Sequence, residues 1–135
     1  MYRETPYNDM YELVNNDKIA QLFGIILEDY GEGWAKTSMI IKEDMLNAYN
    51  LAHGAAIYAL ADVAFAAACN SHGLKAVALS VTIHYRRPAS LGRKLFAIAE
   101  EESKGKTTAL YKIKVIDEEG KLIALATGLA YISGD

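Results

Sequence analysis

One long stretch of the chain is apolar on every side, and the other elements are arranged around it. Residues 53–72, HGAAIYALADVAFAAACNSH, are rich in Ala and contain no Pro and no β-branched run, which favours a helix. A helix that is apolar all the way round is buried, under a wrapping sheet, against a partner helix or in a membrane. Asp62 carries the only formal charge in this stretch, and an isolated carboxylate in apolar surroundings is costly unless it is paired or does chemistry. Asp62 is therefore the first candidate functional residue.

The central stretch does not have the pattern of a membrane span. A span needs about 20 apolar residues, whereas this run is shorter, carries Asp62 near its middle and has no flanking Lys or Arg cluster. Its small Ala and Gly side chains allow another backbone to come close. The pattern therefore favours a helix that is covered by a sheet or pressed against a copy of itself.

The residues before the central stretch predict a short helix and a hairpin. Asp9 followed by Glu12 resembles a capping box, and the apolar positions after it form a loose helical stripe. These positions are Met10, Leu13, Val14, Ile19 and Leu22. Residues 24–30 and 34–42 are strand-like runs joined across glycines, which is typical of a hairpin. Residues 47–52 are expected to form a loop.

After the central stretch the pattern changes from helical to alternating. Between 77 and 85, Val, Leu, Val, Ile and Tyr alternate with Ala, Ser, Thr and His, which predicts a half-buried strand that ends at Pro88. Three further strand-like runs follow, with tight turns between them. They span 95–103, 107–116 and 122–132. The elements predict one α+β domain over residues 1–135, in which a strongly curved antiparallel sheet wraps around one long helix.

Composition and charge exclude several classes of function. The 135 residues, 23% of them charged, fit one globular domain, and a formal net charge of −3 with scattered Lys and Arg argues against a nucleic-acid surface. Cys69 is the only cysteine, so no disulfide forms within the chain, and no signal peptide opens the sequence. Both observations favour the cytoplasm. Cys69 and His72 lack further converging ligands, so no metal site is expected.

Two motifs carry a resemblance to a known family. The stretch NAYNLAHGAAIYALAD at 47–62 and the strand end YRRPASLG at 85–92 resemble the hotdog-fold acyl-CoA thioesterases, most closely the phenylacetate-pathway type. The resemblance covers nearly the whole chain. It implies the hotdog fold, a homodimer with a shared sheet that assembles into a homotetramer, and hydrolysis of acyl-CoA without any other cofactor. It also implies an aromatic acyl group, such as phenylacetyl, or a medium-chain one.

Thioester hydrolysis needs a donor for the oxyanion, a carboxylate, and a group that holds water. Gly54 lies at the start of the central helix, where backbone N–H groups are unpaired, so its amide is the candidate oxyanion donor. Asp62 matches the family's catalytic carboxylate, as general base or as nucleophile, and Asn47 matches the residue that orients water. The alternatives are a pairing role for Asp62 at a dimer contact and an ordinary local turn for Asn47.

Further residues are expected at the substrate. His53 matches the family's motif histidine and is interpreted as a hydrogen-bonding residue at the helix start, with a catalytic role as the alternative. Ala55 replaces the second Gly that is usual in the family and therefore affects the pocket entrance. Thr82 is expected near the acyl group, with simple packing as the alternative. The phosphates of coenzyme A are expected to meet a basic rim. Its members are Arg86, Arg87, Arg93, Lys94, Lys104 and Lys106.

Helix geometry predicts that one chain cannot complete the site. Gly54 and Asp62 are eight residues apart, which corresponds to about 80° of rotation and about 12 Å of rise. Two antiparallel central helices would bring Gly54 and Asn47 of one chain to Asp62 of the other, giving two equivalent sites per dimer.

Two other functions remain open: a hotdog-fold hydratase or dehydratase, and a non-catalytic acyl-CoA-binding module. The first centres its site on a His paired with a carboxylate on a differently patterned helix. The second would keep the fold and lose the carboxylate, which Asp62 supplies here.

Overall fold

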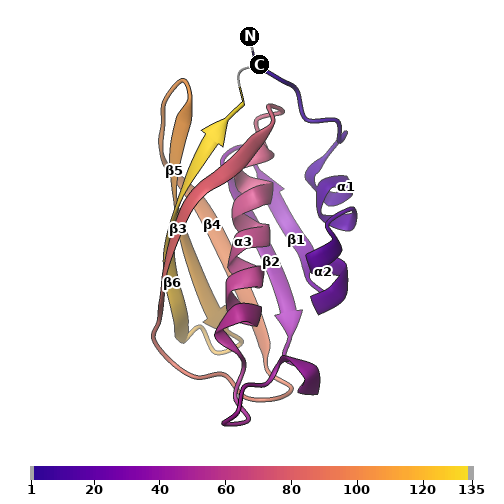
Figure 1. Cartoon of the computed structure of the whole chain (residues 1–135), viewed down its shortest axis with the longest axis vertical. Helices are drawn as coiled ribbons and strands as arrows, with labels where there is room; N and C mark the ends of the chain where they lie inside the picture. Colours follow the sequence, from indigo (N-terminus) through magenta and orange to yellow (C-terminus); the bar gives the residue numbers. More distant parts are fainter. Residues whose placement is uncertain (1, 134–135) are drawn as a thin grey trace.

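A computed structural model describes residues 2–133, and in it a curved sheet holds one long helix against its concave face (Figure 1). Short helices precede the sheet, and most strands follow the long helix. The elements are α1 (Met10–Asn15), α2 (Lys18–Phe23), β1 (Ile26–Gly31), β2 (Trp34–Ile40), the 3₁₀ turn η1 (Glu43–Met45), α3 (Gly54–Asn70), β3 (Ala76–Tyr85), β4 (Lys94–Lys104), β5 (Thr108–Asp117) and β6 (Leu122–Ile132).

Across the described residues, six strands form one antiparallel sheet in the order β1-β2-β4-β5-β6-β3. Strand β5 shows why the sheet has one apolar face, because buried and exposed residues alternate along it. Its buried side chains include Ala109, Tyr111, Ile113 and Val115. The predicted architecture, a curved antiparallel sheet around one long helix, is confirmed.

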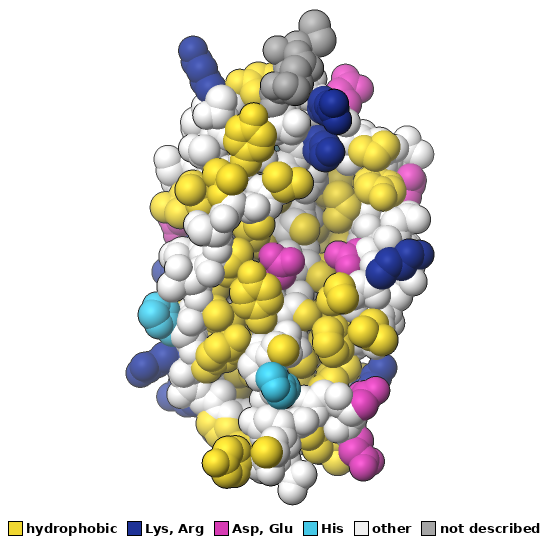
Figure 2. Space-filling view, viewed as in Figure 1, with side chains coloured by type: hydrophobic (Ala, Val, Ile, Leu, Met, Phe, Trp, Pro, Cys, Tyr) yellow, Lys and Arg dark blue, Asp and Glu magenta, His cyan; other side chains and the backbone are white. Residues whose placement is uncertain are grey.

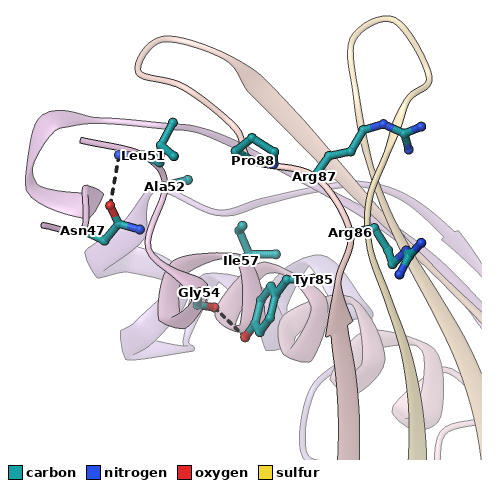
Figure 3. Close-up of a pocket in the computed structure, with 9 residues that line it drawn as sticks. All are labelled: Asn47, Leu51, Ala52, Gly54, Ile57, Tyr85, Arg86, Arg87 and Pro88. Atoms are coloured by element: carbon teal, nitrogen blue, oxygen red, sulfur yellow. Dashed lines mark hydrogen bonds between the residues drawn. The ribbon is translucent and has the colours of Figure 1, made fainter. Parts of the chain in front are cut away.

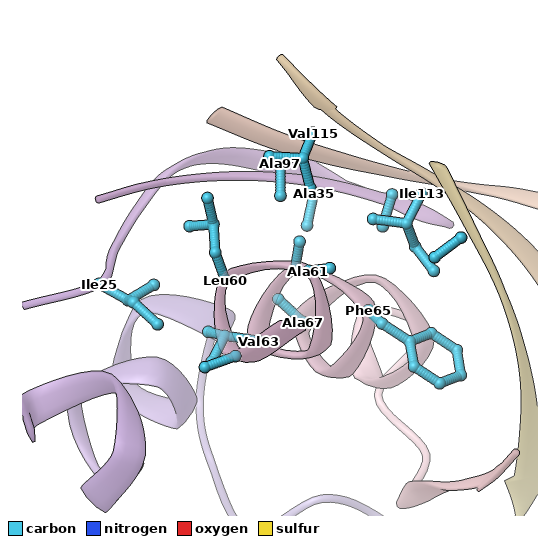
Figure 4. Packing of buried hydrophobic residues seen from close by; sticks show 14 of the residues in the cluster. Ile25, Ala35, Leu60, Ala61, Val63, Phe65, Ala67, Ala97, Ile113 and Val115 are labelled. Atoms are coloured by element: carbon cyan, nitrogen blue, oxygen red, sulfur yellow. The ribbon is translucent and has the colours of Figure 1, made fainter. Parts of the chain in front are cut away.

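The helix α3 fits the sheet because its sheet-facing side chains are small. Leu60 and Ala61 point toward β2 and β4, where Ala35 and Ala97 leave room for them (Figure 4). The larger Phe65 lies over Gly128, where an added Cβ would stand 2.8 Å from the ring. Such close packing is typical of a well-formed core. No helix within residues 2–133 is long and apolar enough to cross a membrane.

The N-terminal segment forms two short helices, so the prediction of a single helix is wrong. The predicted cap at Asp9 is confirmed. The first helix ends at the C-cap Asn16, and a second N-cap, Asp17, starts α2 by accepting hydrogen bonds from two backbone N–H groups. The expected apolar stripe does not continue into the core, because Ile19 is exposed and Leu22 is 70% exposed.

Strand β3 lies at an edge of the sheet and is more exposed than its alternating pattern predicts. Its register against β6 shifts between Ala78 and Ser80, so Val77 and Val81 face opposite sides of the sheet. Val81 packs toward α3, whereas Leu79, inside the bulge, is 56% exposed. The strand predicted for 77–85 is confirmed as β3, but the single buried face predicted for it is wrong within one chain, because nothing in the described part of this chain covers the outer edge of β3.

Candidate active site

The N-terminus of α3 leaves one backbone N–H group free for a substrate. His53 caps the helix, and its Nδ1 accepts the N–H of Ala55 at 2.9 Å. The N–H groups of Ala56 and Ile57 donate to the His53 carbonyl at 3.0 and 3.2 Å. No acceptor within residues 2–133 lies on the N–H of Gly54. Because this N–H stands at the positive end of the helix dipole, it is placed to stabilise an oxyanion.

The predicted role of His53 at the helix start is confirmed. Because its Nδ1 accepts a hydrogen bond, the ring in this arrangement carries its proton on Nε2. His53 and Ala55 face a small hollow of about 170 Å³ that also borders Phe23 at the end of α2. Their contact with substrate stays a prediction.

Tyr85, which the sequence placed only in a strand, holds the other side of the helix start. Its hydroxyl donates to the carbonyl of Gly54 at 2.9 Å. A Cβ added to Gly54 would lie 3.1 Å from Cζ of Tyr85, so the tyrosine packs directly on the glycine. The sequence signal was weak, because an aromatic residue before Arg-Arg-Pro reads as an ordinary strand end.

The two ends of the Asn47 side-chain amide have different surroundings. Its Oδ1 accepts the N–H groups of Tyr49 and Leu51 at 2.9 and 3.1 Å, which confirms the local turn considered as an alternative. These two bonds orient the amide so that its NH₂ group remains available, and Figure 3 shows it beside the helix start. Asn47 can therefore touch a substrate or water only as a donor.

Asn47 and Gly54 line the same cavity, which has a volume of about 350 Å³. The loop after η1 forms one wall, and the residues that follow β3 form the other (Figure 3). The remaining lining residues are Leu51, Ala52, Ile57, Tyr85, Arg86, Arg87 and Pro88. An apolar slot with a few polar groups at its floor and Arg residues at its rim is typical of a small-molecule site.

The sequence predicted that the basic residues form one rim. This prediction is wrong for a single chain, because these residues lie at separate places on it. Arg87 lies at the cavity, and its Nη1 donates to the Leu122 carbonyl at 3.1 Å. Lys104 lies instead near His72, at the far end of α3. The turn that holds Lys106 lies at that same end, because the β4–β5 hairpin extends away from Gly54 (Figure 1).

The remaining rim candidates are already engaged by acidic side chains. Arg93 forms ion pairs with Asp117 and Glu119, at 3.3 and 3.2 Å. Lys94 lies 3.7 Å from the carboxylate of Glu28. Arg86 and Arg87 are thus the basic residues that this chain presents at the cavity.

Asp62 lies partly exposed on the side of α3 that faces away from the sheet. Burial raises the pKa of its carboxyl above the usual value, and the nearby charge of Asp17 raises it further. No hydrogen bond or ion pair joins the Asp62 carboxylate to another residue in the described part of the chain. The carboxylate is therefore available for chemistry or for a second chain.

The structure does not bring Asp62 and Gly54 together within one chain. Gly54, Tyr58 and Asp62 follow one another at four-residue intervals along the exposed side of α3. At this spacing the two ends of the series are about 12 Å apart along the helix, whereas reacting groups must approach to about 3–3.5 Å. Figure 2 shows this face, with hydrophobic side chains gathered around acidic ones near its centre.

Thr82 lies away from the cavity in this chain. It is exposed and pairs with Thr127 of β6, at a position that alternates with Val81 and Ile83, which pack toward the core. Side chains alternate between the two faces along a strand, so with Val81 and Ile83 toward the core Thr82 points to the opposite face of the sheet. The contact between Thr82 and an acyl group stays a prediction.

Cys69 and His72 each contact other parts of the chain. Within residues 2–133 no three His, Cys, Asp or Glu side chains are grouped so that they could hold a metal ion. Burial raises the pKa of the Cys69 thiol to about 12, and His72 instead pairs with Glu101 at 2.9 Å. The hydroxyl of Tyr111 donates to the same Glu101 oxygen, so this cluster is satisfied internally.

A curved antiparallel sheet wrapped around one long central helix is the hotdog fold. The sequence matches the model of the thioesterase superfamily over residues 49–124. The chain belongs to the thioesterase superfamily.

Similar proteins of known fold support this assignment. The acyl-coenzyme A thioesterase PaaI of Escherichia coli K12 is 37% identical over 128 residues, 95% of this chain and 91% of the relative. The solved E. coli PaaI structure has a TM-score of 0.88 at 38% identity, covering 90% of this chain and 88% of that one. The TT0310 protein of Thermus thermophilus has a TM-score of 0.83 at 38% identity, covering 87% and 98%. A Streptococcus pneumoniae TIGR4 structure, described as a hypothetical thioesterase protein with coenzyme A, has a TM-score of 0.78 at 25% identity, covering 82% and 87%.

Proposed function

We propose that this chain hydrolyses acyl-CoA thioesters to a free acid and coenzyme A, at sites shared between two chains. The observation that carries the proposal is the free N–H of Gly54, which opens into a cavity beside the amide of Asn47. The similarity to PaaI and to a structure with coenzyme A supports the same substrate class.

In the proposed reaction, the carbonyl oxygen of the thioester accepts the N–H of Gly54 and becomes the oxyanion. The NH₂ group of Asn47 donates to a water molecule and leaves the protons of that water free for a base. Asp62 of the second chain takes one proton while the water oxygen bonds to the carbonyl carbon. The C–S bond then breaks, and the proton passes to the departing thiolate. Direct attack by Asp62, through an anhydride, is the other route open to the same groups.

The environment of Asp62 suits a base. Its pKa is raised by burial and by Asp17, and a carboxylate with a raised pKa is the stronger proton acceptor while it remains ionised. Since no group within residues 2–133 pairs with Asp62, its lone pairs remain available.

The cavity gives coenzyme A a direction of approach. Apolar side chains such as Ile57 and Pro88 line the slot and suit the pantetheine chain. Arg86 and Arg87 at its mouth suit phosphates. A second hollow of about 470 Å³ shares Arg87 and Pro88 with the first and includes Lys121, so it continues the groove toward a nucleotide.

A second copy of the chain completes the site in this proposal. The exposed edge of β3 offers unpaired backbone groups, which suit antiparallel pairing with β3 of another copy. The same twofold axis places the two α3 helices antiparallel, with Gly54 of one chain near Asp62 of the other. Two such dimers would form the expected homotetramer, and Lys104 and Lys106 would then reach a site only through another chain.

A panel of acyl-CoA substrates tests the activity and the acyl preference. Free thiol released from acetyl-, hexanoyl-, decanoyl-, benzoyl- and phenylacetyl-CoA is followed colorimetrically, with Asp62→Asn as the matched control. We expect release with aromatic or medium-chain substrates and background with Asp62→Asn. Binding of the same compounds without release, by calorimetry, would favour a non-catalytic module. Loss of an enoyl-CoA absorbance without free thiol would favour a hydratase.

A mixing experiment tests the shared site. Asp62→Ala and Asn47→Ala chains, each inactive alone, are refolded together. A mixed dimer then carries both defects in one site and none in the other, so about a quarter of all sites are intact after random pairing. A site contained in one chain would never be restored. Mixtures that stay inactive despite verified heterodimers would refute the shared arrangement.

A further inference from the structure

The outward side of α3 is a narrow stripe of four-residue steps. Within α3, the side chains that are not buried are those of Ala55, Tyr58, Asp62 and Ala66, together with Gly54 at the start. All other positions of this helix are buried against the sheet and the N-terminal helices. Tyr58 is the only large side chain on the stripe and is 36% exposed. A second helix that packs on this side must therefore meet the ring of Tyr58.

The proposed shared site fixes where two α3 helices cross. If Gly54 of one chain faces Asp62 of the other, and the reverse, the twofold axis passes midway between positions 54 and 62. That midpoint is position 58. For antiparallel helices, each residue then faces the one at the same distance on the other side of this midpoint, and Tyr58 faces its own copy.

We infer that Tyr58 lies on the twofold axis, where the two tyrosine rings meet and form a wall common to both acyl sites. This inference rests on the proposed function, because the pairing of Gly54 with Asp62 sets the axis. Each Tyr58 is one helical turn, about 6 Å, from Gly54 on one side and Asp62 on the other. An acyl group bound to either site must therefore pass along the Tyr58 rings, which makes Tyr58 a residue that determines acyl size.

The neighbours of Tyr58 within the chain agree with this position. Burial, and then the charge of Asp62, raises the pKa of Tyr58, and burial, and then Tyr58, raises the pKa of Tyr85, so the three side chains lie near one another on this face. Tyr85 in turn holds the Gly54 carbonyl at 2.9 Å. The series thus runs from the oxyanion donor to the carboxylate with Tyr58 between them.

Cysteine cross-linking tests the position of the axis. Packed helices lie about 8–10 Å apart, and with Cα atoms about 2.3 Å from each helix axis, facing Cα atoms are roughly 3–5 Å apart. A disulfide requires Cα atoms within about 7 Å. Tyr58→Cys should therefore form a covalent dimer with oxidised glutathione on a non-reducing gel. Along the helix, Asp62→Cys lies about 12 Å and Ala66→Cys about 24 Å from its own copy, so neither should cross-link.

The same variants separate the inference about Tyr58 from the proposed thioesterase function. The expected result is a covalent dimer in most Tyr58→Cys chains and in few control chains. Cross-linking of Tyr58→Cys no greater than that of Ala66→Cys, in a protein that is dimeric by light scattering and releases thiol, overturns the inference and leaves the proposed function standing. A wild-type chain that is monomeric or inactive refutes the proposed function itself.

An acyl-length comparison tests the role of the wall without relying on a disulfide. Tyr58→Ala removes the ring and should shift the ratio of kcat/KM for decanoyl-CoA over butyryl-CoA by about tenfold or more toward the longer chain. Tyr58→Phe keeps the ring and should leave this ratio within about twofold of wild type. An unchanged ratio in folded, active Tyr58→Ala overturns the role assigned to Tyr58.

Discussion

Replacing Gly54 by Ala adds one methyl group where the ring of Tyr85 leaves little room for it. The new carbon would lie 3.1 Å from Cζ and 3.3 Å from the hydroxyl oxygen of Tyr85, closer than the roughly 3.5–4.0 Å of a comfortable carbon contact. The tyrosine must therefore retreat by about 0.5 Å and lose its hydrogen bond to the Gly54 carbonyl. That bond is worth about 1 kcal/mol, and Ala gains about 0.5–1 kcal/mol over Gly in a helix. The two changes nearly cancel.

The expected result of Gly54→Ala is a stable protein with poor activity. The melting temperature should stay within about 4 °C of wild type, because the net change in free energy is small. The methyl group also stands beside the free N–H, and a displacement of the thioester by about 1 Å lowers kcat/KM by about a hundredfold. Thermal unfolding followed by circular dichroism gives the first quantity, and thiol release gives the second.

Tyr85→Phe is the matched control for Gly54→Ala. It removes the same hydrogen bond without adding a methyl group, so it should lower kcat/KM only a few-fold. If Gly54→Ala keeps activity within a few-fold of wild type, substrate does not approach the Gly54 amide. If instead Gly54→Ala and Tyr85→Phe lose activity equally, the hydrogen bond rather than the added methyl group explains the loss.

Three other predictions use the buried and half-buried titratable groups. Asp62→Asn should lower turnover at least about a hundredfold, about 2.7 kcal/mol of activation free energy, in a folded protein; turnover within a few-fold of wild type would remove Asp62 from the mechanism. Because the folded-state pKa of Asp62 is raised, its protonated form stabilises the fold at low pH and this contribution is lost as pH rises through that pKa, so Asp62→Asn should raise the free energy of unfolding at pH 7, as urea titration measures. Cys69, whose pKa is raised to about 12 by burial, should react with an aromatic disulfide reagent only after denaturation; rapid labelling of native protein would contradict its burial.

The parts of the fold that the sequence predicted are those with local causes. The long helix follows from Ala-rich propensity, and the cap at Asp9 from a side chain and a backbone N–H three residues later. The cap at Asp17 has the same local cause. The apolar stripe, however, predicted one longer helix that included Ile19 and Leu22. Local capping there outweighed periodicity.

The parts that the sequence did not predict depend on contacts between distant segments. The hydrogen bond from Tyr85 to Gly54 joins positions 31 residues apart, and no periodicity indicates it. The placement of Lys104 at the far end of α3 follows from the length of the β4–β5 hairpin, whereas the sequence shows only a basic turn. The candidate residues Asn47 and Gly54 came together as predicted, because one short loop carries both.

The exposed edge of β3 connects the activity of the protein with its tendency to aggregate. This strand, AVALSVTIHY, contains no Lys, Pro or acidic residue, the features that keep an exposed edge from recruiting foreign strands. In the proposed dimer, the encounter that completes each active site also covers this edge. Dilution or a weakened interface would then remove activity and expose a template for aggregation in the same event, so cells that need the enzyme working also need it paired soon after synthesis.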